Sequence, residues 1–186
     1  TIHHLISTGF SSGNEGNEHA GLIYAAFQER ATRISHGNVA KLAVASGEEG
    51  LARICRKIAA DETRHEVFYT RIVGELFERD PETTLLAYRS VLKRLIAMPG
   101  SRMSDAHEPD LFERFAGAAQ RTGVYTSRDY AAIISHLNGA WNVEHRSFSG
   151  KAAKAQEYLC RQPERYEALS DELGGRLAKQ PPARFA

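Results

Sequence analysis

The feature that most constrains the fold is a stretch from residue 18 to residue 79 that contains no proline. It is rich in Ala, Leu, Glu and Arg, which favour helix. Gly47 divides the stretch and Asp80-Pro81 ends it, so we predict helices over about 18–46 and 48–79. At about 1.5 Å per residue, a helix of roughly 30 residues is about 45 Å long. Helices of that length favour a bundle.

The rest of the sequence also predicts helix, in shorter pieces that end near the six prolines. No run of alternating apolar and polar residues is long enough to predict a sheet, so the predicted fold class is all-α. We assign residues 1–179 to one helical domain that opens on the end of a helix at Thr1–Thr8. Residues 180–186 are expected to form a loose tail. The shorter helices are predicted over 82–98, 110–122, 127–144, 151–161 and 165–179.

Composition and charge exclude several classes of protein. The 186 residues carry 24 Lys+Arg against 23 Asp+Glu, which gives no reason to expect nucleic acid or an anionic membrane as a partner. No window approaches 18 apolar residues, so we expect no membrane span. The two cysteines, Cys55 and Cys160, cannot form a disulfide framework, and we expect both to be buried in a protein of a reducing compartment.

Two polar side chains interrupt the apolar stripe of the predicted helix 48–79. The stripe has spacings of three or four residues, which keep its members on one face that we predict to point into the core. A buried carboxylate and imidazole are costly unless something compensates them. Glu-x-x-His is also the spacing by which one helix offers an oxygen and a nitrogen ligand to one metal ion. The stripe consists of Leu51, Ile54, Ile58, Glu62, His65, Tyr69, Ile72 and Leu76.

The preceding predicted helix carries a matching polar residue, Glu29, in the middle of one of its faces. Two adjacent antiparallel helices would bring Glu29, Glu62 and His65 together, and such an oxygen-rich set suits iron or manganese. The alternative is structural: Glu62 pairs with Arg30 or Arg64, and His65 is a core histidine with satisfied hydrogen bonds. The spacing alone leaves both interpretations open.

Several stretches resemble one family in content and in order. The chain is similar to the soluble acyl-acyl-carrier-protein desaturases from Thr1 to about Lys179. No other di-iron family known to us joins these stretches in this sequence. The stretches are FQERAT (27–32), ISHGN (34–38), IAADETRHE (58–66), Ala97-Met98-Pro99, AQRTGVYT (119–126) and AQEYLCR (155–161).

The resemblance implies a ferritin-like bundle, a homodimer and a non-haem centre of two Fe2+ ions. It implies O2-dependent insertion of a double bond into a fatty acyl chain carried as a thioester on acyl carrier protein, with electrons from a ferredoxin-type donor. By the match, Glu29, Glu62 and His65 are iron ligands. Thr32 matches a threonine on the oxygen-binding side. Asp61 matches a carboxylate that orients a ligating histidine of the other half-site, and such partners commonly matter almost as much as ligands.

The chain departs from the family pattern in its number of ligands. The family site needs a second carboxylate helix and a second Glu-x-x-His upstream of the position that matches Thr1. We therefore expect this chain to supply half of the iron ligands and to be a piece of a longer enzyme. One alternative is a truncated, non-catalytic helical module that binds acyl carrier protein or dimerises. Another is a ferroxidase-type iron binder in which two copies pair their half-sites.

Two further expectations concern surface and location. The basic residues Arg53, Arg56, Lys57 and Arg64 lie close together in sequence and form either a solvated face or a docking point for the acidic carrier protein. The Ala/Arg-rich composition favours a bacterial cytoplasm, and a plastid is the expected location if the source is a plant.

Overall fold

The computed structural model describes residues 3, 14, 16–94, 96 and 110–177. Every regular element among them is a helix, so the all-α prediction is confirmed, and the long helices are those of a ferritin-like bundle. None of the described helices is long and apolar enough to cross a membrane. The helices are α2 (Glu18–Ala45), α3 (Glu49–Arg79), α4 (Pro81–Lys93), α5 (Leu111–Thr122), α6 (Ser127–Ala140) and α7 (Gly150–Leu177).

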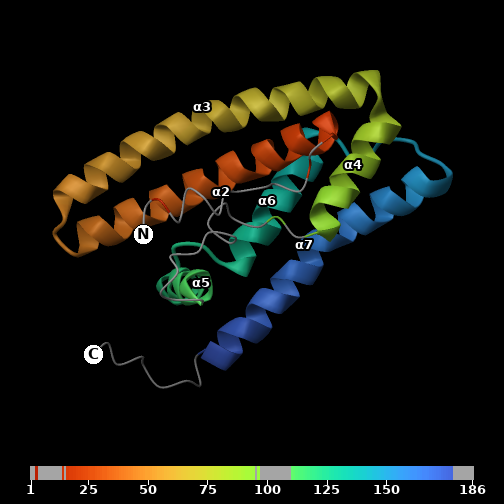
Figure 1. Cartoon of the computed structure of the whole chain (residues 1–186). Coiled ribbons are helices and arrows are strands. Elements are labelled where there is room, and N and C mark those ends of the chain that lie inside the picture. Colours follow the sequence, from red (N-terminus) through yellow and green to blue (C-terminus); the bar gives the residue numbers. More distant parts are fainter. Residues whose placement is uncertain (1–2, 4–13, 15, 95, 97–109, 178–186) are drawn as a thin grey trace.

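Helices α2 and α3 form a long antiparallel pair with the most extensive contact between elements in the described structure (Figure 1). Their bounds agree with the sequence prediction within a residue or two. Asn17 begins α2 by accepting a hydrogen bond from the amide of Ala20. The turn between the helices places Gly47 at a φ of +78°, a conformation that glycine adopts without steric cost. Asp80 ends α3 and caps α4 through the amide of Thr83.

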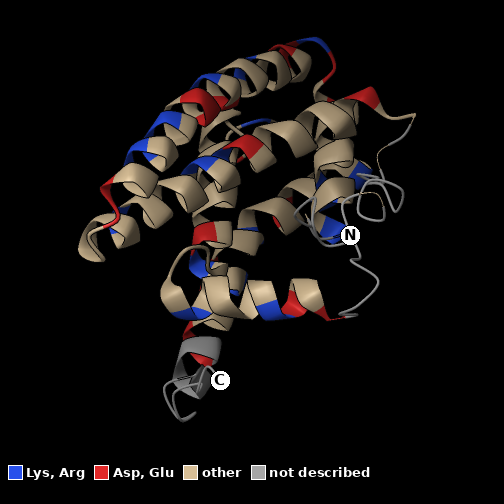
Figure 2. Ribbon diagram, turned by 60° about the vertical axis from the view of Figure 1, so that its left-hand side comes forward, with Lys and Arg blue, Asp and Glu red and all other residues tan. Residues whose placement is uncertain are grey.

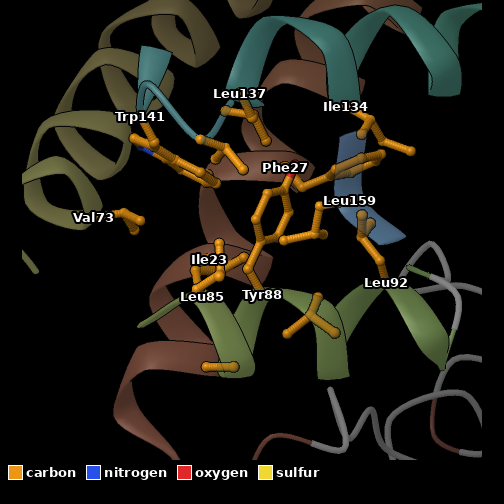
Figure 3. Close-up of a cluster of buried hydrophobic side chains, with 14 of the residues drawn as sticks. Ile23, Phe27, Val73, Leu85, Tyr88, Leu92, Ile134, Leu137, Trp141 and Leu159 are labelled. Atoms are coloured by element: carbon orange, nitrogen blue, oxygen red, sulfur yellow. The ribbon is translucent and has the colours of Figure 1, made fainter. Parts of the chain in front are cut away.

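The core is one cluster to which α2, α3, α4, α6 and α7 all contribute (Figure 3). Trp141, just after α6, is 1% exposed and is the largest of the fully buried side chains among the described residues. Its ring centroid is 5.0 Å from that of Tyr88 and 5.7 Å from that of Phe77. Its indole nitrogen donates to the carbonyl of Thr70 with a nitrogen–oxygen distance of 3.0 Å, which ties the end of α6 to α3.

The face of α3 that points inward is not the one that the apolar stripe predicted. The buried residues of α3 are Ala52, Cys55, Glu66, Val73 and Phe77, on a neighbouring face of the helix. From the predicted stripe, Leu51 is 46% exposed and Ile54 is 59% exposed. The reason is that most of the contact of α3 is with α2, so only a narrow strip of its apolar surface is covered.

Helices α4 and α6 are shorter than predicted. α4 ends at Lys93 rather than near Met98, and the amide of Ile96 donates instead to the hydroxyl of Tyr130 on α6. α6 ends at Ala140 rather than Glu144, because the chain turns to bury Trp141 and Asn142 has a φ of +52°. The C-terminal ends of α4 and α6 therefore depend on tertiary contacts of single side chains, Tyr130 and Trp141. No local sequence pattern shows such contacts.

Helix α7 is continuous where we predicted two helices separated by a break near Pro163. It runs from Gly150 to Leu177 with Pro163 inside it. Proline cannot donate to the carbonyl four residues earlier, which belongs to Leu159. The side-chain amide of Asn138 on α6 donates to that carbonyl instead, at 3.0 Å. The break predicted from proline is therefore wrong because a neighbouring helix supplies the missing donor.

Some predictions fall outside the described residues. These are the helix end at Thr1–Thr8, the stretch Ala97-Met98-Pro99 and the tail over 180–186. The division into a domain over 1–179 and a tail stays a prediction.

Candidate metal centre

Three predicted ligands converge between α2 and α3. Glu29 projects from α2, and Glu62 and His65 lie nearly one turn apart on α3. The Nδ1 atom of His65 is 3.2 Å from a carboxylate oxygen of Glu29 and 3.3 Å from one of Glu62. One candidate ligand atom from each residue can be chosen so that all three lie within 4.8 Å of one another. The spacing therefore predicted correctly which side chains meet.

The cluster lies at the edge of the α2–α3 contact rather than in the core. The side chains of Glu29 and Glu62 are 23% and 19% exposed, and that of His65 is 57% exposed. The prediction that Glu62 and His65 face the core is therefore wrong for the described residues. The three groups instead form an open site on one flank of the helix pair, where a metal ion or a further protein element can reach them.

Neighbouring charges change the protonation of this cluster. Burial, followed by the hydrogen bond and charge of Glu62, raises the pKa of Glu29 from its ordinary 4.5 to about 7. Hydrogen bonds to Glu29 and then to Glu62 raise the pKa of His65 above 6.5. Glu29 and His65 therefore hold their protons more tightly than the free groups do, and binding of a cation at this site would displace those protons.

The donor set fits iron. Two carboxylates and one imidazole combine hard oxygen donors with a nitrogen donor, a set that suits Fe2+ or Mn2+ and lacks the thiolates that soft metals favour. The ligand atoms already lie close together without the ion, and a cation between them would relieve the repulsion of Glu29 and Glu62. The role of Glu29, Glu62 and His65 as ligands stays a prediction.

The structural alternative for these residues does not match the observed contacts. Arg64 pairs with Asp61, and Arg30 pairs with Glu66, so neither arginine makes the ion pair that the alternative gave to Glu62. His65 is exposed and is not a core histidine.

The other two predicted site residues do not join the cluster. The hydroxyl of Thr32, one turn after Glu29, donates to the carbonyls of Gln28 and Glu29 at 3.0 Å each. Asp61 lies beside Glu62 on α3, and its carboxylate is paired with Arg64. Both roles stay predictions.

The most buried charged residue beside the cluster, Glu66, was not predicted from the sequence. Glu66 follows His65 and is 6% exposed. Arg30 and Arg33 of α2 both donate to its carboxylate, the latter from Nε at 2.7 Å. A signal was present, because Ala52, Cys55, Glu66, Val73 and Phe77 recur at helical spacing along one face.

The remaining candidates have ordinary surroundings. Cys55 is buried as predicted, but Cys160 is only half-buried. The basic residues Arg53, Arg56, Lys57 and Arg64 are exposed on α3. Figure 2 shows residues of both signs interspersed along the long helices, and the choice between a solvated face and a docking point stays open.

Comparison with known proteins relates this helical chain to one family. A family model described as fatty acid desaturase matches residues 1–186. The chain is 46% identical to the chloroplastic acyl-[acyl-carrier-protein] desaturase of Cucumis sativus over 187 residues, which cover 100% of this chain and 47% of that protein. It is 49% identical to the chloroplastic stearoyl-[acyl-carrier-protein] 9-desaturase 2 of Arabidopsis thaliana over 179 residues, 95% of this chain and 44% of that protein. For the chloroplastic stearoyl-[acyl-carrier-protein] 9-desaturase of Ricinus communis the identity is 45% over 187 residues, 100% of this chain and 47% of that protein.

The chain therefore belongs to the fatty acid desaturase family. It spans about half the length of the curated relatives that it matches. This result confirms the resemblance stated from the sequence.

Proposed function

We propose that this chain is part of an acyl-[acyl-carrier-protein] desaturase, which inserts a double bond into a fatty acyl chain carried on acyl carrier protein. The observation that carries the proposal is the convergence of Glu29, Glu62 and His65 on one flank of α2 and α3, in a chain of the desaturase family. The names of the relatives support the substrate class, because they are acyl- and stearoyl-[acyl-carrier-protein] desaturases.

Glu29, Glu62 and His65 would hold iron, which, when bound, would supply the O2-dependent oxidation of saturated carbon that side chains lack. The overall reaction balances as one CH2–CH2 unit, O2, two electrons and two protons giving one CH=CH unit and two waters. The three ligand residues of this chain are half of those that the family resemblance implies.

Each residue of the cluster has a defined task in this proposal. Glu29 and Glu62 bind iron as carboxylates, so the proton that Glu29 holds near pH 7 must leave when the metal enters. His65 binds through a ring nitrogen as neutral imidazole. We assign Thr32 to the oxygen-binding side and Asp61 to the orientation of a histidine outside the described cluster.

The partners follow from the same chemistry. The acyl chain arrives as a thioester on acyl carrier protein, and a ferredoxin-type protein delivers the two electrons. We propose that the enzyme is a homodimer. We place it in the bacterial cytoplasm, or in a plastid if the source is a plant. The chloroplastic names of the relatives support the plastid location for a plant protein.

The test is an assay of the natural gene product that contains these residues. The purified protein is loaded anaerobically with Fe2+ and supplied with ferredoxin, a reductant, O2 and saturated acyl carrier proteins of several chain lengths. Mass spectrometry of the released fatty acids should detect a product two mass units lighter. The Glu62→Ala variant should lose this product while retaining its helix content by circular dichroism.

Glu75→Ala is the matched control, because Glu75 is an exposed carboxylate on the same helix. It should leave the yield of unsaturated product unchanged. If Glu62→Ala keeps full activity, Glu62 is not a ligand. If the wild-type protein forms no product with any chain length, the non-catalytic module that binds acyl carrier protein or dimerises replaces the desaturase. Rapid O2-dependent oxidation of Fe2+ without unsaturated product would indicate the ferroxidase-type binder.

A further inference from the structure

A compact charge cluster lies one residue from the candidate ligands on both long helices. We call it the Glu66 clamp, and it consists of Glu66, Arg30, Arg33 and His136. Arg30 donates to Oε1 of Glu66, and Nε of Arg33 donates to Oε2 at 2.7 Å. Nε2 of His136 on α6 lies 3.4 Å from Oε1. The clamp therefore joins α2, α3 and α6 through one buried carboxylate.

The contacts fix the position of this carboxylate. A buried carboxylate is costly unless charged donors compensate it, and here each oxygen has its own guanidinium. Burial and then the positive charge of Arg30 lower the pKa of His136, so the positive charge of the clamp comes from the two arginines. Since both oxygens of Glu66 are engaged, the carboxylate cannot rotate freely.

The place of the clamp in the sequence gives it a consequence for the metal centre. Arg30 follows Glu29 on α2, and Glu66 follows His65 on α3. Adjacent residues differ by about 1.5 Å along a helix axis, so any slide of α2 past α3 that separated Glu29 from His65 would also break the clamp.

The ligands themselves provide little of this restraint. The side chain of His65 is 57% exposed, so packing does not hold it. Its contacts with Glu29 and Glu62, at 3.2 and 3.3 Å, join charges that would repel without the imidazole or a metal between them. The axial register of α2 against α3 must therefore be fixed nearby by other groups, and Glu66 is the buried charged group at that level.

We propose that Glu66 is a positioning residue for the candidate metal centre, and that Arg30 and Arg33, with His136, hold it so that Glu29 meets Glu62 and His65 in register. The identity of the metal rests on the proposed function, whereas the geometric role of the clamp does not. Glu66 itself binds no metal in this proposal and acts through the backbone of α3.

The test uses the full chain and two readouts. In metal-free protein, the 15N resonances of the His65 imidazole, assigned by their loss in His65→Gln, report its contacts with the carboxylates. In a Co2+ titration, visible absorption reports affinity and coordination geometry. The variants are Glu66→Gln, Arg33→Gln and Arg33→Lys. Arg128→Gln is the matched control, because it breaks the exposed 2.6 Å ion pair with Asp171 between α6 and α7.

We expect Glu66→Gln and Arg33→Gln to shift the His65 resonances, change the Co2+ spectrum and weaken Co2+ binding about tenfold or more. Arg33→Lys should recover most of both signals, and Arg128→Gln should change neither. If Glu66→Gln unfolds the chain, the His65 resonances and Co2+ binding of Arg33→Gln test the proposal instead. A lower melting temperature with wild-type resonances and wild-type Co2+ binding would overturn the proposal. If the wild-type chain binds no Co2+, the ligand set of the proposed function fails, and the His65 resonances alone decide on the clamp.

Discussion

The side-chain amide of Asn138 donates a hydrogen bond to the backbone carbonyl of Leu159, with a nitrogen–oxygen distance of 3.0 Å. In a regular helix this carbonyl would accept from the amide of residue 163, but Pro163 has no N–H. Helix α6 thus supplies the donor that α7 lacks. The bond joins the two helices at the point where α7 would otherwise be weakest.

Asn138→Ala should lower the free energy of unfolding by about 1–3 kcal/mol, because it leaves the carbonyl of a buried residue without its donor. In a Pro163→Ala background the same change should cost less, since the introduced alanine carries an N–H that can reach the carbonyl of Leu159. Urea unfolding of the four proteins of this double-mutant cycle measures the coupling. Equal costs in both backgrounds would show that the Leu159 carbonyl does not link the two positions.

Trp141 is expected to be the most costly side chain of the core to truncate. Trp141→Ala should lower the free energy of unfolding by about 3–5 kcal/mol, because it removes ring contacts with Phe77 and Tyr88 together with the hydrogen bond to Thr70. Trp141→Phe should cost less, since it keeps an aromatic ring. Phe115→Ala is the control: Phe115 is 75% exposed on α5, so a change within about 0.5 kcal/mol is expected. Thermal or urea unfolding compares the three variants, and equal losses would contradict the contribution assigned to the buried ring of Trp141.

The long helices were predictable from the sequence because their ends are local. Gly47, with a φ of +78°, and Asp80-Pro81, whose aspartate caps the next helix, are local signals, and α2 and α3 end beside them. The C-terminal ends of α4 and α6 were not predictable in this way. The continuity of α7 through Pro163 depends on Asn138, which lies 25 residues earlier in the sequence. Helical periodicity also located an apolar stripe on α3 but did not show that only its neighbouring face is covered.

The candidate site was predictable to the extent that it depends on spacing. Glu62 and His65 had to share a face, and Glu29 lies in the middle of a face of the preceding helix, so antiparallel pairing of the two helices predicted that these three residues meet. The exposure of the site did not follow, because burial depends on which elements pack against α3. The clamp around Glu66 joins residues from three helices, so no single-helix pattern could predict its partners.

Glu29 and His65 should make the metal-free chain less stable as pH rises from about 5 to 8, whereas His136, whose pKa is lowered in the fold, contributes in the opposite direction. The folded chain raises the pKa of Glu29 to about 7 and that of His65 above 6.5, so both groups bind protons more tightly when folded than when unfolded. The contribution of Glu29 is complete below pH 4.5 and is lost as pH rises through about 7; that of His65 is complete below 6.5 and is lost above it. Urea unfolding in the presence of a chelator measures the slope. Glu29→Gln should flatten it, and an unchanged slope in that variant would show that Glu29 does not titrate as described.

The purified chain should bind at most one ferrous ion per polypeptide. The described residues bring together one group of three ligand side chains, Glu29, Glu62 and His65, which can complete the coordination of one ion only with water or a further protein group. Anaerobic titration with Fe2+, followed by gel filtration and iron analysis, gives the stoichiometry, and His65→Gln should reduce it. Sedimentation of the loaded protein distinguishes a monomer with one ion from two copies that share a pair of ions. Two tightly bound ions on a monomeric chain would contradict the proposal that this cluster supplies half of a two-iron site.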